Sequence, residues 1–431
     1  MKVLVLDEWI PYPLISGKRL RSYHLLSRAA RDHQMTYLCF AEPDCGAAPG
    51  GVSSGDRVAR EHMKSLGMRM VTLPARDPFI PRQRLYALAT MNLLSPWPLV
   101  MRKHFRSDYL VKVRELVAAE KFDLIHCEWT HYGAYARLIP GLPRFLSSHN
   151  IEAMPWERLY RHEVNPVKRA ALYVEWRKME AFEREISRSF HHVSAVSEDD
   201  RKKFTGDYGC ESVTVIPNGV DVQYYGEAVA GTGSGAEARR FTAGVRGKTL
   251  VFSASFDAFV NQDAVVYWME TIWPRLAREI PAARMLFLGK DPPPSLGRYV
   301  SDRVLFTGTV PDVRQHLAQS SVCVVPLRVA GGSRIKILEA MAAGLPVVST
   351  PEGAEGLDVI PGQHLMIASG ADEFVSAVAR LLQDEGMVRY LTANGRKLVE
   401  EKYDWRNIAR LVPVAWEETV RRFTDGRDAR R

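Results

Sequence analysis

The chain has 431 residues, of which 46% are apolar and 25% charged, and this composition excludes a disordered, collagen-like or disulfide-dense protein. The length suffices for two domains with separate cores. Residues 1–220, with 32 basic and 25 acidic side chains, carry +7 of the formal net charge of +8, which favours an anionic partner or surface facing that half. Because no nucleic-acid recognition motif accompanies this charge, we expect no nucleic-acid partner.

The amino terminus and the cysteines both bear on the compartment. The opening MKVLVLDEW is typical of a first strand and lacks the features of a signal peptide, so we expect a cytoplasmic protein. Five cysteines without a CxxC pair or a zinc-spaced Cys/His cluster predict a reducing environment and no metal site. The longest uncharged stretch, residues 85–101, is too short and too interrupted to span a bilayer.

In the first half, short apolar runs alternate with longer segments of helical periodicity. This alternation predicts βαβ units, and hence a parallel sheet with helices on both faces. We place this first α/β domain at residues 1–222. Its expected strands are 2–6, 35–40, 69–73, 123–127, 144–148, 192–196 and 213–216.

A Gly-, Ala- and Ser-rich stretch, residues 223–247, predicts a linker, after which the alternation restarts. A second doubly wound domain is expected at 248–405, followed by a helical segment over 406–431. In such folds ligands bind at the carboxyl ends of the strands, so two facing domains would place a site in the cleft between them. The expected strands are 249–255, 284–289, 303–308, 322–327, 345–350 and 365–368, and the expected helices include 261–279, 312–319 and 334–343.

The most informative segment is GGSRIKILEAMAAGLPVVST, residues 331–350. Ser333 is suited to cap a helix whose first turn holds Arg334 and Lys336, two cations that oppose the positive end of the helix dipole unless an anion binds there. Gly331 and Gly332 leave room for backbone amides to approach a ligand. These five residues predict a diphosphate site. The alternative is that both cations simply point into water.

Glu339 follows Lys336 by one helical turn and shares its face of the predicted helix. A carboxylate in this position can accept hydrogen bonds from both hydroxyls of a ribose. The alternative is an exposed ion pair with Lys336, worth only about a few tenths of a kcal/mol.

This segment resembles the donor-site signature of the family-four retaining glycosyltransferases, and its GGxRxKILEAMA part is most similar to bacterial exopolysaccharide-type sugar transferases. The resemblance implies a GT-B fold, in which two Rossmann-like, doubly wound parallel-sheet α/β domains face a cleft. The first domain would bind the acceptor and the second the donor, and the segment over 406–431 would return to the first domain. Five further segments resemble the same family: EWIPYPLISGKRLRSYHLL, VSAVSEDDRKKF, VIPNGVDVQYY, FTGTVPDVRQHLAQSSVCVVPL and EKYDWRNIAR.

The resemblance also implies the roles of individual residues. His149, Arg334 and Lys336 would be catalytic, although an isolated histidine such as His149 is more often structural. Lys18, Glu128 and His131 would contact the acceptor. Contacts to the donor are implied for Gly17, Asn150, Ser255, Asn261, Val310, Gly331, Gly332, Ser333 and Glu339.

Two positions depart from the family pattern. Many members carry a glutamate eight residues before Glu339, where this chain has Gly331. Many also carry an arginine and a lysine after the first strand of the second domain, where this chain reads SASFDAFVNQDA and offers only Ser255 and Asn261 nearby. Neutralisation of the diphosphate would therefore pass to Arg334 and Lys336.

The implied reaction transfers a sugar from a nucleotide diphosphate sugar, with UDP favoured over GDP, to a hydroxyl of a lipid-linked or polysaccharide acceptor in cell-surface glycan synthesis. The resemblance implies retention of the anomeric configuration, no metal and no separate cofactor. Two alternatives stay open: a non-hydrolysing nucleotide-sugar epimerase, and a catalytically degenerate scaffold subunit that binds sugar nucleotides.

One segment suggests a peripheral contact with anionic lipid on the inner face of the plasma membrane. Residues 81–105 join aromatic and aliphatic side chains with flanking cations, a combination suited to a membrane surface. A helix buried against the first domain's sheet, with its basic ends in water, explains the pattern equally well. The residues concerned are Arg82, Arg84, Tyr86, Leu93, Leu94, Trp97, Leu99, Arg102 and Lys103.

Overall fold

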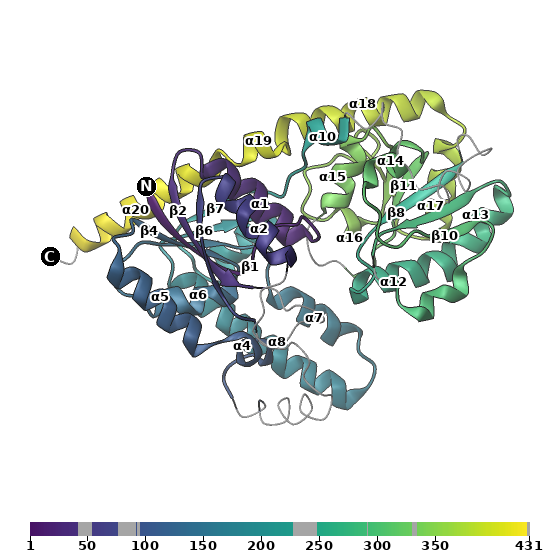
Figure 1. The fold of residues 1–431 in the computed structure, drawn as a ribbon. Coiled ribbons are helices and arrows are strands. Elements are labelled where there is room, and N and C mark those ends of the chain that lie inside the picture. The colour runs from purple at the N-terminus through teal and green to yellow at the C-terminus, as the bar shows by residue number, and fades with distance from the viewer. Residues whose placement is uncertain are drawn as a thin grey trace. The chain divides into compact units, whose positions relative to one another are not determined.

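The computed structural model describes residues 1–41, 54–75, 92, 95–226, 248–290, 292–329 and 334–428. The chain divides into two compact units (Figure 1). The first comprises Met1–Pro217 together with Ala409–Arg431, and the second comprises Asn218–Ile408. Each unit has its own hydrophobic core.

The first unit is built on a seven-stranded parallel sheet of order β3-β2-β1-β4-β5-β6-β7. The chain adds strands on one side of β1 and then on the other, as in doubly wound folds. All seven strands predicted for this half are confirmed. They are β1 (Lys2–Trp9), β2 (Gln34–Phe40), β3 (Met68–Leu73), β4 (Leu124–Glu128), β5 (Arg144–Ser147), β6 (His192–Ala195) and β7 (Val213–Val215).

Helices cover this sheet, and the last of them comes from the far end of the chain. α20 (Leu411–Asp428) packs against β4, β5 and β6 and buries Trp416 completely (Figure 1). The other helices are α1 (Gly17–Ala29), α2 (Ser54–Ser65), α4 (Leu99–His104), α5 (Ser107–Ala119), α6 (Thr130–Arg137), α7 (Ala153–His162), α8 (Pro166–Arg188), α9 (Glu198–Lys202) and the π-helical turn η1 (Lys203–Asp207).

The second unit repeats the architecture with a six-stranded parallel sheet of order β10-β9-β8-β11-β12-β13. The strands predicted for the second half are confirmed, with bounds shifted by one or two residues. They are β8 (Thr249–Ser253), β9 (Arg284–Leu288), β10 (Val304–Phe306), β11 (Val322–Val325), β12 (Val347–Ser349) and β13 (Met366–Ile367).

The helix predicted over 261–279 is present as three consecutive pieces, because a π-helical turn interrupts it just before Pro274. A proline has no N–H to donate to the preceding turn, and the wider turn accommodates that loss. The helices of the second unit are α10 (Val222–Gly226), α12 (Phe259–Tyr267), η3 (Trp268–Ile272), α13 (Trp273–Glu279), η4 (Pro294–Tyr299), α14 (Val313–Ala318), α15 (Ile335–Ala342), α16 (Pro351–Ala354), α17 (Ala371–Leu381), α18 (Glu385–Lys402) and α19 (Trp405–Ile408).

The unit boundaries differ slightly from the predicted ones. The first unit ends at Pro217, and the first four residues of the predicted linker, 223–226, lie in α10. A helix of five residues is too short to produce a periodicity that sequence reasoning detects. The rest of that linker, 227–247, lies outside the described residues. The chain re-enters the first unit at Ala409.

Only part of the segment predicted to contact lipid can be compared with the structure. Trp97 is 39% exposed and packs against Phe105 and Phe182. No helix in the described ranges is both long enough and apolar enough to cross a membrane. Cys39, Cys127, Cys210 and Cys323 are buried free thiols. Other residues of the segment predicted to contact lipid lie outside the described part of the chain, namely Arg82, Arg84, Tyr86, Leu93 and Leu94, and the side chains of Arg102 and Lys103.

Candidate active site

The first turn of α15 places Lys336 beside Asn261, which in turn contacts Ser255. Both Asn261 and Ser255 were also expected at the donor site. The Nζ of Lys336 donates a 3.1 Å hydrogen bond to Oδ1 of Asn261 and lies 4.5 Å from the centre of the Phe252 ring. Asn261 in turn donates to the backbone carbonyl of Ser255, at 2.7 Å. Burial lowers the pKa of Lys336 to about 8. An anion beside this ammonium would raise that pKa again.

Arg334 corrects the predicted start of this helix. The helix begins at Ile335, so Arg334 occupies the N-cap position and not the first turn, and no side chain of a described residue caps the helix there. Its backbone, with φ −85° and ψ 27°, lies outside the helical region. The guanidinium pairs with Glu355 at 2.9 Å and does not point freely into water. Gly331, Gly332 and Ser333, the predicted cap among them, lie outside the described residues.

Glu339, one turn along α15, is held by a tyrosine from α10. The Tyr225 hydroxyl donates a 2.7 Å hydrogen bond to Oε1 of Glu339. Burial raises the pKa of Glu339, whereas Tyr225 and the nearby Lys336 oppose the rise. The alternative of an exposed Lys336–Glu339 ion pair is wrong, since in the described part of the chain each of these side chains bonds to a different partner.

α10 also contacts α14, which follows the loop that contains Val310. Val310 packs against the core of the second unit. The Arg314 guanidinium lies 3.8 Å from the centre of the Tyr224 ring and donates to the Tyr224 carbonyl at 3.0 Å. Two further donors of Arg314 bind the carboxylate of Asp312. The backbone of α10 is therefore bonded to α14 while its Tyr225 side chain orients Glu339.

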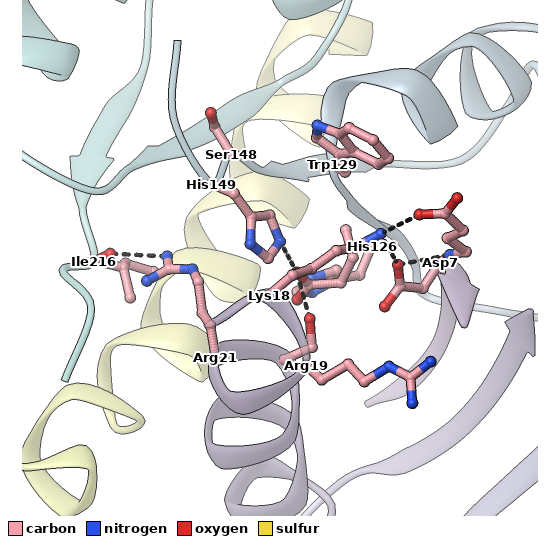
Figure 2. Close-up of polar contacts among 12 residues, drawn as sticks. Asp7, Lys18, Arg19, Arg21, His126, Trp129, Ser148, His149 and Ile216 are labelled. Atoms are coloured by element: carbon pink, nitrogen blue, oxygen red, sulfur yellow. Dashed lines mark hydrogen bonds and ion pairs between the residues drawn. The ribbon is translucent and has the colours of Figure 1, made fainter. Parts of the chain in front are cut away.

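In the first unit, side chains meet at the carboxyl ends of β1, β4 and β5 (Figure 2). Gly17 begins α1, which is capped by Ser16. The next residue, Lys18, places its Nζ 3.0 Å from Asp7, 3.2 Å from Glu8 and 4.4 Å from the centre of the Trp129 ring. Burial by itself would lower the pKa of Lys18, but the two carboxylates raise it above its ordinary value.

Glu128, the last residue of β4, is fully buried and accepts three hydrogen bonds. Its donors are Ser22 Oγ at 3.1 Å, His126 Nε2 at 2.9 Å and His149 Nε2 at 2.6 Å. Burial would raise the pKa of Glu128, but the two histidines hold it well below its ordinary value. The structure thus brings together Glu128 and His149, which the sequence had assigned to different roles.

The other two predicted residues of this unit have no hydrogen bond to that cluster. His131 is buried in α6 with its ring 3.9 Å from that of Trp129, and neither ring nitrogen has a hydrogen-bond partner among the described residues. Burial lowers the pKa of His131 to about 3, so the ring is neutral. Asn150 follows His149 and is half-buried, and its carbonyl accepts a hydrogen bond from Ser148 Oγ at 2.7 Å.

Sequence reasoning missed several members of these clusters. For His126 a signal existed, because it precedes Glu128 by two residues in a strand and so faces the same side of the sheet. Asp7 and Glu8 likewise stand near the end of the first strand. For Arg21, whose guanidinium donates to the carbonyls of Ile216 at 2.8 Å and Pro217 at 2.9 Å, and for Trp416, no local pattern points to the contact.

Both parts of the chain match family models. The model described as Glycosyltransferase Family 4 matches residues 23–224, and that described as Glycosyl transferases group 1 matches residues 247–384. The chain belongs to the family-four glycosyltransferases. The resemblance seen in the motifs is thereby confirmed, and sugar transfer is the activity of the family.

One relative of this glycosyltransferase is a GDP-mannose-dependent alpha-(1-6)-phosphatidylinositol monomannoside mannosyltransferase from Mycolicibacterium smegmatis. It is 26% identical over 283 residues, which are 62% of this chain and 68% of that protein. The chain spans only 26% and 29% of the lengths of two further curated relatives that it matches.

Solved structures confirm the GT-B fold. A sucrose-phosphate synthase from Thermosynechococcus elongatus is 18% identical and superposes with a TM-score of 0.67 over 97% of this chain and 98% of that chain. The Anabaena HepE protein in complex with UDP and glucose is 16% identical, with a TM-score of 0.65 over 97% of this chain and 99% of that chain.

Proposed function

We propose that this glycosyltransferase moves a sugar from a nucleotide diphosphate sugar to a hydroxyl of a lipid-linked or polysaccharide acceptor in cell-surface glycan synthesis, with retention of anomeric configuration. The observation that carries the proposal is the pair formed by Lys336 and Glu339, one helical turn apart on α15. A buried ammonium and an oriented carboxylate at this spacing suit a diphosphate and the ribose attached to it.

In the proposed reaction, Lys336 and Arg334 stabilise the negative charge that grows on the leaving diphosphate. Electrostatic stabilisation of this kind needs no bound metal, and we propose a metal-independent enzyme. Gly331, Gly332 and Ser333 are proposed to offer backbone amides to the same phosphates. Ser255 and Asn261 would complete the donor site by orienting Lys336, and Val310 would contact the nucleobase.

The cluster of the first unit is proposed to serve the transferred sugar and the acceptor. Lys18, Glu128 and His131 are assigned to the acceptor, and Gly17, His149 and Asn150 to the donor sugar. The arrangement supports one refinement of the role of His149. Its Nε2 is already committed to Glu128, so only Nδ1 is left for a sugar hydroxyl.

The nucleotide is proposed to be UDP. HepE, which shares the fold, binds UDP in its solved structures, whereas the mannosyltransferase relative is GDP-mannose-dependent. Both classes of donor therefore enter the test. We further propose that the protein acts in the cytoplasm, at the inner face of the plasma membrane, where a lipid-linked acceptor is located.

The test incubates the purified protein with UDP- and GDP-sugars and a lipid-linked glycan acceptor, with and without EDTA. A new glycoside with free nucleoside diphosphate supports transfer, and its unchanged yield in EDTA supports metal independence. An isomerised donor indicates an epimerase, and binding without turnover indicates a scaffold. Co-sedimentation with anionic but not zwitterionic vesicles checks the membrane contact. Glu339→Ala should abolish recognition of the nucleoside part of the active donor.

A further inference from the structure

A hydrogen bond from the C-terminal helix determines where one buried histidine carries its proton. Trp416 on α20 donates its indole N–H to Nδ1 of His126 at 2.9 Å. An indole nitrogen can only donate, so Nδ1 must be the unprotonated nitrogen of His126. The proton is then on Nε2, which donates to Oε1 of Glu128 at 2.9 Å. A proton on Nδ1 would set two donors against each other, so Trp416 selects the Nε2–H tautomer of His126.

The second carboxylate oxygen of Glu128 extends this hydrogen-bond network to His149. It accepts hydrogen bonds from His149 Nε2 at 2.6 Å and from Ser22 Oγ at 3.1 Å. An ionised carboxylate has no proton to give, so His149 must donate through Nε2. Three donors thus converge on Glu128. All residues of this hydrogen-bond network belong to the first unit.

Burial, more than the charged groups around it, keeps His149 neutral near pH 7. Burial lowers its pKa, and the facing Arg21 and Lys18 lower it further, whereas Glu128 opposes the shift. A neutral ring with its proton on Nε2 presents Nδ1 as an acceptor. Nδ1 has no hydrogen-bond partner within the described residues, and the His149 side chain is 12% exposed.

We propose that Trp416 is a positioning residue for His149, acting through His126 and Glu128 so that Nδ1 of His149 accepts a hydrogen bond from a hydroxyl of the bound sugar. This inference rests on the proposed function only for the identity of the bound group. Which ring nitrogen of His126 and of His149 carries the proton does not depend on that bound group. Triad enzymes use the same logic when a buried carboxylate fixes the tautomer of a histidine.

The first experiment measures the tautomers directly, without any substrate. Long-range ¹H–¹⁵N spectra of histidine-labelled protein, with the His126 signal assigned by His126→Gln, should show the Nε2–H tautomer of neutral His126. In Trp416→Phe, the Nδ1–H tautomer of His126 should appear as well, because the indole donor that excluded it is gone. An Nδ1–H tautomer of His126 in the unaltered protein would overturn the proposal.

The second experiment measures the effect on His149 and on sugar transfer. Trp416→Phe should change the titration of His149 and lower kcat/KM about tenfold, the effect typical of a lost outer hydrogen-bond partner. In the His126→Gln background, the same substitution should change neither quantity, because an amide has no tautomers to select. Equal effects in both backgrounds would show a merely structural role for Trp416.

Trp268→Phe is the matched control. Trp268 is equally buried, but it lies in the second unit and its indole nitrogen has no hydrogen-bond partner in the described part of the chain. This variant should leave the histidine spectra and kcat/KM unchanged. If Trp416→Phe does not fold, the spectra of the unaltered protein still decide the order of the protons. If no donor is turned over while the spectra agree, the proposed function fails and the tautomer assignment stands.

Discussion

The hydroxyl of Tyr225 lies 2.7 Å from Oε1 of Glu339, so the carboxylate proposed to bind a ribose is oriented by a side chain from α10. The bond joins residues of two short helices, and the two residues are 114 positions apart in the sequence. It also helps to keep Glu339 ionised, since burial alone would raise its pKa.

Tyr225→Phe removes this hydrogen bond and keeps the ring. We expect it to weaken nucleoside diphosphate binding about 3- to 10-fold, the effect of one hydrogen bond to a charged group. The loss should grow at acidic pH, because Glu339 would then protonate at a higher pH. Calorimetric titration with UDP and GDP measures both effects. Tyr224→Phe is the control, since its ring contact with Arg314 is kept; equal losses in the two variants would remove the role of Tyr225.

Lys336→Met should weaken binding of a nucleoside diphosphate far more than binding of the free nucleoside. In the unaltered protein, burial lowers the pKa of Lys336 to about 8, so diphosphate affinity should fall as the pH rises through this value and the ammonium loses its proton. The variant should lack this alkaline decline. Affinities measured from pH 6.5 to 9.5 test the point, and a decline of the same size in Lys336→Met would assign it to another group.

Arg334→Ala should likewise affect the diphosphate more than the nucleoside. In the structure Arg334 pairs with Glu355. A bound phosphate would compete with Glu355 for the Arg334 guanidinium. Glu355→Gln should therefore strengthen diphosphate binding or leave it unchanged, whereas Arg334→Ala weakens it. If both substitutions weaken binding equally, the ion pair itself matters and Arg334 has no phosphate role.

The contribution of two buried glutamates to the free energy of unfolding should fall as the pH rises from about 5 to 8.5. Burial raises the pKa of Glu183 to about 8 and that of Glu152 to about 7. The folded protein therefore keeps protons that the unfolded chain, with ordinary glutamate values, has already released, and stability is lost as these groups ionise. Urea denaturation across this range measures the slope. Glu183→Gln should flatten it, and an unchanged slope would show that Glu183 is not responsible.

Gly133→Ala should destabilise the first unit by about 1–2 kcal/mol. A Cβ at this position of α6 would lie 2.5 Å from Cγ2 of Ile186 on α8, and the resulting strain outweighs the gain in helix propensity. Gly206→Ala is the control, since no atom lies within 4 Å of its added Cβ. Thermal unfolding compares the two, and equal stabilities would mean that α6 and α8 move apart without cost.

The architecture could be predicted because its signals are local. Strands such as 249–255 and 284–289 are short, apolar and separated by helical segments, and this spacing alone indicates a parallel sheet. Lys336 and Glu339 could be nominated together because residues three apart on a helix share a face. The N-cap at Arg334 was not predictable, since two polar residues in succession, Ser333 and Arg334, can each occupy that position.

The partners of the site residues were decided only in three dimensions. No local pattern near Glu339 indicates Tyr225, and none near His126 indicates Trp416, because the two members of each pair belong to separate elements that meet only when the unit folds. The two parallel sheets, the family and the chemical types of the site residues could be inferred from the amino-acid sequence. Tertiary packing decided which donor faces which acceptor, and hence the protonation of His126, Glu128 and His149, because burial makes those few contacts outweigh solvation by water.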